Sequence, residues 1–415
     1  MNNIARVGIY IHIPYCLSKC PYCDFNSYAI HRSVETSDGL GELEDDYTEA
    51  VVSEISTYAR SDSWRGREVA TIFFGGGTPS LFSHRAIARI LESISTDFPI
   101  AANAEVTLEC NPGTIHERLD VDRLARYRAA GVNRISLGAQ SFSAAKLKKL
   151  GRLHAPDDTK SAVRNICEAG YTNFNLDLIF SVEGETLADW KKDINEAIAL
   201  EPNHISPYNL TIEPGTEFHA RTRKGAVLTV SEEAQAELFA FTETELGTNG
   251  YQRYEISNFA KPTFECAHNL AYWRRTPYLG IGAGAHGFDD TDWGTRWSNE
   301  RSPKIYIERV TQEGHSRVKV ETLSERDAEF EFLFLGLRTI AGISRKTFVQ
   351  SFTPARWEPY AAFFQQAAGD GLILQNNGSV RLSKRGVLFS DSIFEALARV
   401  SVSKAPQQPS AQLVS

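Results

Sequence analysis

The sequence predicts an α/β protein in which six parallel strands alternate with helices and form an open barrel of six βα units. Two patterns indicate this class. Short segments rich in β-branched and aromatic residues, typical of buried strands, each end in Gly, Pro or Asn. Longer segments with helical periodicity separate them. Barrels of this kind carry their chemistry at the ends of the strands, where the distinctive polar residues of this chain fall.

Strands and helices are expected to alternate up to about residue 220. The expected strands are Val7–Pro14, Val69–Phe74, Ala104–Glu109, Val132–Leu137, Phe174–Ile179 and His204–Ile212. The expected helices include Tyr47–Ala59, Ser83–Ser95, Asp122–Ala130, Asp157–Glu168 and Leu187–Leu200. The acidic segment Gly39–Asp46 is expected to be a solvated surface loop.

The pattern changes near Leu323. The order there is helix, helix, a hairpin in Gly371–Leu382 with an Asn-Gly turn, and a last helix. This order predicts a small, mostly helical, winged-helix-like domain with a protein-contact or lid role, because it lacks an obvious basic recognition face. We therefore expect a barrel at 1–220, a connecting region at 221–322, the winged-helix-like domain at 323–400 and a disordered tail at 401–415.

Composition narrows the class of protein further. The chain has 415 residues, 42% of them hydrophobic, which is enough for one large core and a smaller one. A net charge of −8 argues against a general nucleic-acid-binding surface. No apolar run approaches a membrane span and no signal-peptide pattern is present, so a cytoplasmic protein is expected. The six cysteines do not form the pattern of a disulfide framework.

Cys16, Cys20 and Cys23 lie on one short loop directly after the first expected strand. Thiolates select iron–sulfur clusters, zinc or copper(I), and three sulfurs can hold three irons of a 4Fe–4S cluster while the fourth iron stays open to an outside ligand. Zinc would want a fourth ligand, for which His12 and His31 are near in sequence. Buried thiols that hold no ligand are the remaining alternative.

The spacing Cys-x3-Cys-x2-Cys, with Tyr22 before the last Cys, resembles the signature of the radical S-adenosylmethionine (SAM) superfamily. The run Tyr10–Pro14 is similar to the branch that contains oxygen-independent coproporphyrinogen III oxidase and its relatives. The resemblance implies that the three cysteines hold a 4Fe–4S cluster whose open iron is chelated by SAM. It also implies that the open (β/α)6 barrel is a radical SAM partial barrel.

The Gly-rich segment Phe74–Ser80 follows the second expected strand. Consecutive glycines let backbone N–H groups approach a charged ligand, although such a segment can also be a simple tight turn into the next helix. The resemblance implies that Gly76, Gly77 and Thr78 contact the methionyl part of SAM.

Four more polar residues lie where strands meet loops or shortly after: Glu109, Gln140, Arg152 and Asp177. A carboxylate there can accept hydrogen bonds from ribose hydroxyls or an ammonium group, and an arginine can hold a carboxylate through two hydrogen bonds. Each residue alone has a structural alternative as a helix cap or a backbone hydrogen-bond partner. The resemblance implies SAM-binding roles for these four and for two tyrosines, Tyr10 and Tyr22. In one departure, the chain reads Ser181-Val182-Glu183 where relatives usually carry Gly-Leu-Pro.

Two features separate the chain from the oxidase. The oxidase carries a further Cys two residues after its third cluster ligand, where this chain has Phe25. The first strand begins only a few residues into the chain, so the oxidase's N-terminal extension is not expected. The run His268-Asn-Leu-Ala-Tyr272-Trp273, preceded by Cys266, is similar to the His-Asn-x-x-Tyr-Trp motif of the HemW-type haem chaperones.

This second resemblance implies a haem chaperone that delivers haem to membrane-bound respiratory proteins, from the cytoplasm and with peripheral membrane association. His268 would then bind haem iron, with Cys266 as the alternative ligand, while Tyr272 and Trp273 offer flat apolar surface. By residue chemistry alone, a His beside aromatic residues is more often a core residue.

Two other functions stay open. The first is an oxygen-independent coproporphyrinogen III dehydrogenase, which acts by radical oxidative decarboxylation. The second is a DNA- or protein-binding regulator that uses its cluster as a redox sensor. The sequence leaves open whether SAM is cleaved, whether the protein is an enzyme, which protein receives the haem, and the oligomeric state, a homodimer included.

Overall fold

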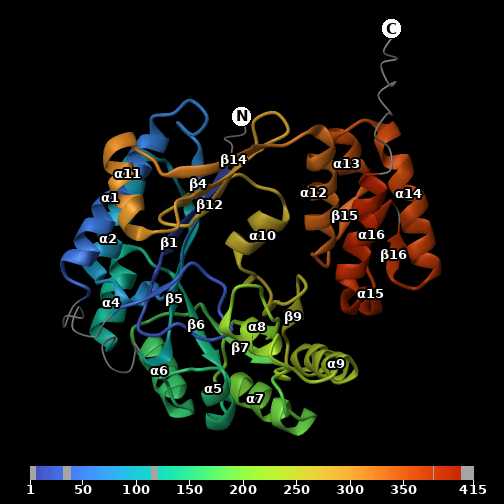
Figure 1. Ribbon diagram of the computed structural model, residues 1–415, viewed down its shortest axis with the longest axis horizontal. Helices are drawn as coiled ribbons and strands as arrows, with labels where there is room; N and C mark the ends of the chain where they lie inside the picture. Colours follow the sequence, from blue (N-terminus) through green and yellow to red (C-terminus); the bar gives the residue numbers. More distant parts are fainter. Residues whose placement is uncertain (1–5, 31–38, 114–119, 377, 403–415) are drawn as a thin grey trace. The chain divides into compact units, whose positions relative to one another are not determined.

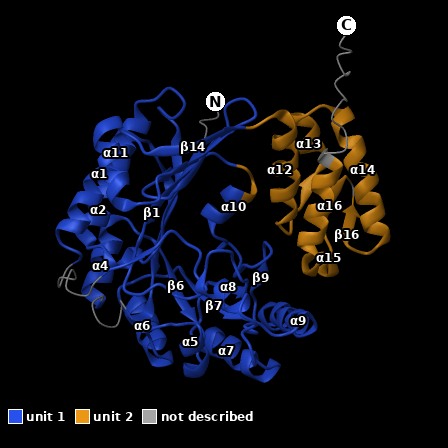
Figure 2. Cartoon of the chain, viewed as in Figure 1, with its two compact units in different colours: residues 1–272, 276–322 blue, residues 273–275, 323–415 orange. Residues whose placement is uncertain are grey.

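The computed structural model describes residues 6–30, 39–113, 120–376 and 378–402. Two compact units are present: residues 1–272 with 276–322, and residues 273–275 with 323–415 (Figure 2). Of the tail predicted to be disordered, residues 403–415 lie outside the described part of the chain.

Six parallel strands form the centre of the first unit, as predicted. They are β1 (Arg6–Ile13), β4 (Glu68–Gly76), β5 (Ile100–Cys110), β6 (Arg134–Gln140), β7 (Phe174–Phe180) and β8 (His204–Asn209), and each pairs with the next in that order. Five of the helices that connect or follow them are α1 (Glu42–Ala59), α2 (His84–Asp97), α4 (Val121–Ala130), α6 (Pro156–Glu168) and α7 (Leu187–Ala199). Figure 1 shows these helices along one side of the sheet.

The sheet extends beyond the predicted strands at both edges. Next to β1 lies β11 (Tyr278–Ile281), which is parallel to it, followed by the antiparallel strands β12 (His286–Asp289), β13 (Thr295–Asn299) and β14 (Arg317–Thr322). Next to β8 lie β10 (Phe259–Ala260) and β9 (Gln252–Arg253). The result is one mixed sheet of twelve strands among the described residues, and its two edges do not pair to close a barrel.

A buried carboxylate joins the additional strands to helix α1. Glu54 accepts hydrogen bonds from the Gly282 backbone N–H (3.0 Å), the Asn299 amide (2.9 Å) and the Tyr306 hydroxyl (2.7 Å). Burial raises the pKa of Glu54 to about 7, and these hydrogen bonds act in the opposite direction. Tyr306 lies on helix α11 (Pro303–Glu313), so one side chain connects two helices with the new edge of the sheet.

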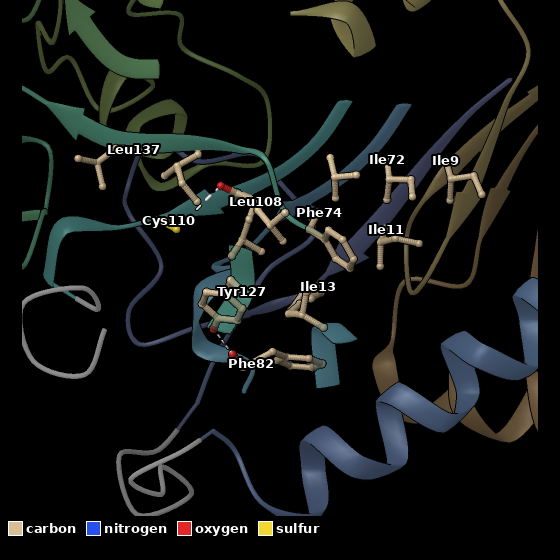
Figure 3. Packing of buried hydrophobic residues seen from close by; sticks show 14 of the residues in the cluster. Ile9, Ile11, Ile13, Ile72, Phe74, Phe82, Leu108, Cys110, Tyr127 and Leu137 are labelled. Atoms are coloured by element: carbon tan, nitrogen blue, oxygen red, sulfur yellow. Dashed lines mark hydrogen bonds between the residues drawn. The ribbon is translucent and has the colours of Figure 1, made fainter. Parts of the chain in front are cut away.

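The side chains of the parallel strands divide by position between a core and an open face. Ile9, Ile11 and Ile13 of β1 pack in the core with Ile72 and with side chains from the neighbouring strands (Figure 3). Because successive side chains of a strand point to opposite faces, Tyr10 and His12 face the other side. The same alternation places Leu108 in the core and Glu109 on the open face.

The acidic segment predicted to be a surface loop is mostly helical. Helix α1 begins at Glu42, so residues 42–46 form its first turn, where acidic side chains suit the helix dipole. Glu44 is buried and accepts hydrogen bonds from the hydroxyl and the backbone N–H of Ser83, the second at 2.9 Å. The prediction was wrong because a partner 39 residues away, not local composition, determines where this carboxylate lies.

The second unit contains the predicted helices and hairpin. Its helices are α12 (Glu325–Leu337), α13 (Arg345–Ser351), α14 (Pro354–Gly369), α15 (Lys384–Leu388) and α16 (Ser390–Val402). A three-stranded antiparallel sheet joins them, formed by β15 (Ile343–Ser344), β17 (Ser379–Leu382) and β16 (Ile373–Asn376). In neither unit does a described helix combine the length and the apolarity needed to cross a membrane.

Candidate functional site

A cavity of about 610 Å³ opens on the face of the sheet opposite the helix-packed core, within the first unit. It contains all three predicted cluster cysteines and all nine predicted SAM-binding residues. These twelve are Tyr10, Cys16, Cys20, Tyr22, Cys23, Gly76, Gly77, Thr78, Glu109, Gln140, Arg152 and Asp177. The chain therefore brings to one cavity residues that are spread over 168 positions of the sequence, from Tyr10 to Asp177.

The cysteine loop begins at β2 (Tyr15–Cys16), which pairs with β3 (Tyr28–Ala29). Two side chains from elsewhere donate to its sulfurs: the Thr78 hydroxyl lies 3.6 Å from Cys16 Sγ, and Arg152 Nη1 lies 3.5 Å from Cys20 Sγ. Burial raises the pKa of the Cys16 thiol to about 11, with the Thr78 hydrogen bond acting against it. Three thiols on one loop, two of them with donors aimed at sulfur, form a ligand set suited to a cluster in which each sulfur holds a different iron.

The zinc alternative lacks an available fourth ligand in the described residues. His12 is buried, with Nδ1 3.0 Å from the Tyr10 hydroxyl and Nε2 2.8 Å from the Asn26 carbonyl. His31 lies outside the described residues. No three His, Cys, Asp or Glu side chains in the described ranges lie close enough together to hold one metal ion.

Close packing explains the glycines at the end of β4. Gly76 has a φ of 108°, and a Cβ there would lie 2.4 Å from His12 Cε1. A Cβ on Gly77 would lie 2.6 Å from the Tyr15 carbonyl oxygen. The segment is held against the end of β1 and the start of β2 by hydrogen bonds from Gly77 N to Ile13 O and from Thr78 N to Tyr15 O, both 2.8 Å.

Two half-buried carboxyl groups form the polar floor of the cavity. Glu109 accepts from the Gly76 backbone N–H at 3.0 Å, and burial together with the charge of Asp177 raises the pKa of Glu109 to about 8. Asp177 accepts from Asn175 Nδ2 (2.8 Å) and Ser136 Oγ (3.1 Å), while burial raises its pKa. The cavity thus offers carboxyl oxygens that can accept hydrogen bonds from hydroxyl or ammonium groups.

Arg152 and Gln140 lie on either side of the short helix α5 (Ala144–Lys149). The Arg152 guanidinium donates to the Gly138 carbonyl (3.0 Å) and to Asn111, as well as to Cys20. Gln140 ends β6 with a φ of 62°, a left-handed conformation that non-glycine residues seldom adopt. This backbone geometry directs the end of β6 toward the cavity that Gln140 lines.

His268, the predicted haem ligand, does not line the cavity, and neither does the alternative ligand Cys266. His268 lies on α10 (Ala267–Trp273), fully buried, with Nδ1 2.8 Å from the Thr71 hydroxyl and Nε2 2.8 Å from the Tyr272 hydroxyl. Burial, and then the charge of Arg134, lowers the pKa of His268 to about 3. Its role as a haem ligand stays a prediction, and binding iron would require one of these hydrogen bonds to break.

Cys266 and Trp273, at the two ends of the same motif, also have defined surroundings. Cys266 is buried, with Sγ 3.4 Å from Glu105 Oε1, and burial raises the pKa of its thiol to about 12. Glu105 also accepts from the backbone N–H groups of Ala267 (3.1 Å) and His268 (3.0 Å) at the start of α10. Trp273 belongs to the second unit.

Sequence reasoning missed a second set of polar residues on the cavity face. They are Asn111, Arg134, Ser136, Asn175, His204 and Ser206. Most of them alternate with core residues along β6, β7 and β8, and that alternation in the sequence could have indicated which side chains face the cavity. Strands buried on both faces read as continuous runs, so the polar positions were not separated from the core.

Comparisons with known proteins agree with this fold and site. The Radical SAM superfamily model matches residues 10–197, and the HemN C-terminal domain model matches residues 323–389. The solved structure of coproporphyrinogen III oxidase (HemN) from Escherichia coli, titled a radical SAM enzyme, superposes with a TM-score of 0.78. It covers 95% of this chain and 90% of that chain at 23% identity, so this likeness concerns the fold. Fold and cavity together define a radical SAM protein.

Full-length relatives identify the family. The heme chaperone HemW of Escherichia coli is 37% identical over 95% of this chain and 99% of its own length. The heme chaperones HemW of Haemophilus influenzae and Bacillus subtilis are 36% and 34% identical, over 95% and 93% of this chain and 98% of each relative. The chain belongs to the HemW family of haem chaperones. Superfamily membership implies a 4Fe–4S cluster and SAM as cofactors.

Proposed function

We propose that this protein binds haem and delivers it to haem-requiring acceptors, membrane-bound respiratory proteins among them. We further propose that a 4Fe–4S cluster on Cys16, Cys20 and Cys23 and a SAM molecule occupy its barrel. The observation that carries the cofactor assignment is the single cavity that gathers three cysteines and nine further predicted residues. Haem as the cargo is supported by the full-length similarity to chaperones that carry that name.

In the proposed cofactor site the side chains have different roles toward the cluster and toward SAM. Thr78 and Arg152 donate to the Sγ atoms of Cys16 and Cys20, and hydrogen bonds to ligand sulfurs would tune an iron–sulfur centre held there. Glu109 and Asp177 would accept hydrogen bonds from the ammonium group and ribose hydroxyls of SAM, and Arg152 would also hold its carboxylate. When bound, SAM and a reduced cluster together supply one-electron radical chemistry. The residues of this chain bind and orient that pair in a cavity closed on its core side.

Phe25 favours the haem chaperone function over the oxidation of coproporphyrinogen III. Its side chain is 55% exposed and lines the cavity, in the position where the oxidase carries a further cysteine. A phenyl ring cannot act as a metal ligand, whereas it offers apolar surface to a flat porphyrin. We therefore propose that the protein carries haem and does not decarboxylate coproporphyrinogen III in this cavity.

The haem proposal is tested by loading anaerobically reconstituted protein with haem and recording the Soret band. His268→Ala should shift the band and weaken haem retention if the imidazole binds iron, with the cluster spectrum intact. Tyr272→Phe is the matched control, because it removes the hydrogen bond to Nε2 and keeps the imidazole. If His268→Ala leaves the haem spectrum unchanged, Cys266→Ser tests the alternative ligand. Absence of haem binding by the wild-type protein would overturn the proposal itself.

A further inference from the structure

Helix α5 is a helix of six residues flanked on both sides by proposed SAM-binding residues. Gln140 precedes it and Arg152 follows it, and both line the cavity. The Arg152 backbone N–H donates to Leu147 O at 2.9 Å, so the position of Arg152 follows directly from that of the helix. A shift of α5 would therefore move Arg152 directly and would reach Gln140 through the turn between β6 and the helix.

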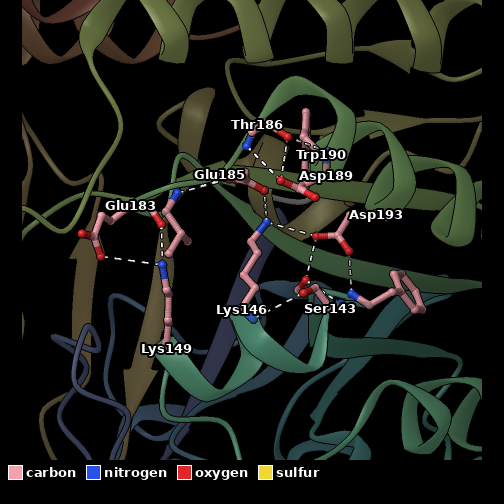
Figure 4. Close-up of polar contacts among 12 residues, drawn as sticks. Ser143, Lys146, Lys149, Glu183, Glu185, Thr186, Asp189, Trp190 and Asp193 are labelled. Carbon is pink, nitrogen blue, oxygen red and sulfur yellow. Dashed lines mark hydrogen bonds and ion pairs between the residues drawn. The ribbon is translucent and has the colours of Figure 1, made fainter.

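A buried lysine fastens this helix to α7. Lys146 Nζ lies between two carboxylates, in contact with Glu185 and 3.0 Å from Asp193 (Figure 4). The side chains of all three are nearly enclosed, with 8%, 2% and 3% of their surface exposed. The Trp190 ring, its centroid 4.9 Å from Nζ, covers the ammonium group. Such a triad is out of solvent, so it holds one geometry instead of exchanging with water.

The two carboxylates also hold the turns that end β6 and β7. Asp193 accepts from Ser141 Oγ and from the Phe142 backbone N–H, both at 2.7 Å, immediately after Gln140. Glu185 accepts from the Val182 backbone N–H at 3.2 Å, immediately after Ser181. Gln140 and Ser181 have φ angles of 62° and 70°. Non-glycine residues hold such angles only where the surroundings impose them, and each carboxylate supplies that constraint.

We propose that Lys146 is a positioning residue for SAM, because it links the strained turns after β6 and β7 and so fixes Gln140 and Arg152 toward the cavity. This inference rests on the proposed SAM site and assigns a role to residues that do not touch it. Lys146, Glu185 and Asp193 do not line the cavity. The ammonium group lies between the two carboxylates and offsets their repulsion, and without it the two anions would repel one another and pull the turns apart.

The test compares Lys146→Met with Lys148→Met, an exposed lysine on the same helix. Each protein is reconstituted anaerobically, and four quantities are measured: iron content, thermal midpoint, the SAM dissociation constant, and the effect of SAM on the electron paramagnetic resonance spectrum of the reduced cluster. Lys146→Met should keep its iron, because the cysteines lie on another loop. It should bind SAM about tenfold more weakly or worse, since a misplacement of about 1 Å in positioned groups can cost on the order of 100-fold. Lys148→Met should match the wild type, and Lys146→Arg should recover part of the affinity.

A folded Lys146→Met protein whose SAM affinity and spectrum equal those of the wild type would overturn the inference and leave only a stabilising ion triad. If Lys146→Met does not fold, Ser141→Ala decides instead. It removes one hydrogen bond to Asp193 and keeps the triad, so the inference requires weaker SAM binding, and unchanged binding overturns it. A wild-type protein that binds no SAM would refute the proposed SAM site and this inference together. That result differs from equal SAM binding by the wild type and Lys146→Met, which would refute the inference alone.

Discussion

The Nε2 atom of His268 lies 2.8 Å from the hydroxyl of Tyr272, one turn further along the same helix. The other ring nitrogen lies 2.8 Å from Thr71 on β4, so this imidazole fastens helix α10 to the sheet. A Cβ on Gly8 would lie 3.0 Å from Thr71 Oγ1 and 3.3 Å from the imidazole, so a side chain at that position of β1 would crowd this pair. The motif that suggests haem ligation thus has a structural role in the described conformation.

The buried His268 should make stability depend on pH in one direction. Its folded pKa of about 3 lies below the ordinary value of about 6.5, so only the unfolded chain takes up this proton between those values. Stability should therefore fall as the pH drops below 6.5, and His268 contributes up to about 1.4 kcal/mol per pH unit. Urea unfolding of His268→Asn at pH 5 and 6 measures how the free energy of unfolding changes with pH. This change per pH unit should be smaller than in the wild type by about that amount. His219→Asn, on helix α8 (Glu217–Thr222), is the control, and an unchanged slope for His268→Asn would contradict this account.

SAM affinity should rise with pH through the ionisation of Glu109. Because the pKa of this carboxyl group is raised to about 8, it is mostly protonated at pH 7, whereas a cationic ligand favours the carboxylate. Binding then releases a proton, so affinity should increase by up to about tenfold per pH unit below pH 8 and level off above it. Calorimetric titration from pH 6.5 to 8.5 measures this profile.

Glu109→Gln should bind SAM more weakly at pH 8.5 and lose the slope, while Glu92→Gln on the exposed side of α2 should keep it. A flat wild-type profile would show that Glu109 acts as a neutral hydrogen-bond donor instead.

Ser181→Gly should stabilise the fold. Ser181 has a φ of 70°, a conformation that costs a non-glycine residue about 1–2 kcal/mol. Its buried hydroxyl finds no hydrogen-bond partner in the described part of the chain, which adds to the cost. Glycine removes both costs but makes the unfolded chain more flexible, by about 0.4–1 kcal/mol. The net gain should be about 1 kcal/mol in urea unfolding, whereas Ser161→Gly inside α6 should destabilise. A loss of stability in Ser181→Gly would show that this turn is not strained.

Replacing any one of Cys16, Cys20 and Cys23 by Ala should abolish the 4Fe–4S absorption of anaerobically reconstituted protein, because each thiolate is expected to hold a separate iron. Cys167→Ser changes an exposed thiol on α6 and should leave the spectrum intact. Stoichiometric zinc in anaerobically purified protein, with no iron–sulfur signal, would instead favour the zinc alternative.

The sequence predicts the six central strands because each has a strong local signal, such as the three isoleucines of β1. It does not predict β9 to β14. Most of these strands are short, and β11 joins the central sheet through β1, which is far away in sequence. Glu54 reaches Asn299 across 245 positions, and no local pattern encodes that contact. The acidic composition around Glu44 gives a wrong prediction for the same reason, because its hydrogen-bond partner Ser83 lies far away in the sequence.

The candidate site was predictable where a motif carries it. The cysteine loop and the glycines of β4 have strong signatures, and the strand-end residues line the same cavity. Lys146 was not predictable, because its environment depends on Glu185 and Asp193 of a later segment. The surroundings of His268 were missed for a similar reason, since Thr71 lies 197 positions away.

The measurement that tests the central claim most directly is an anaerobic comparison of two cargoes. Reconstituted protein with SAM and reductant is given either haem or coproporphyrinogen III, and porphyrin products and bound haem are both quantified. Haem should bind and then pass to a haem-free respiratory membrane protein added afterwards, while coproporphyrinogen III should remain unconverted. Protoporphyrinogen formed at a catalytic rate, or haem that neither binds nor transfers, would contradict the account.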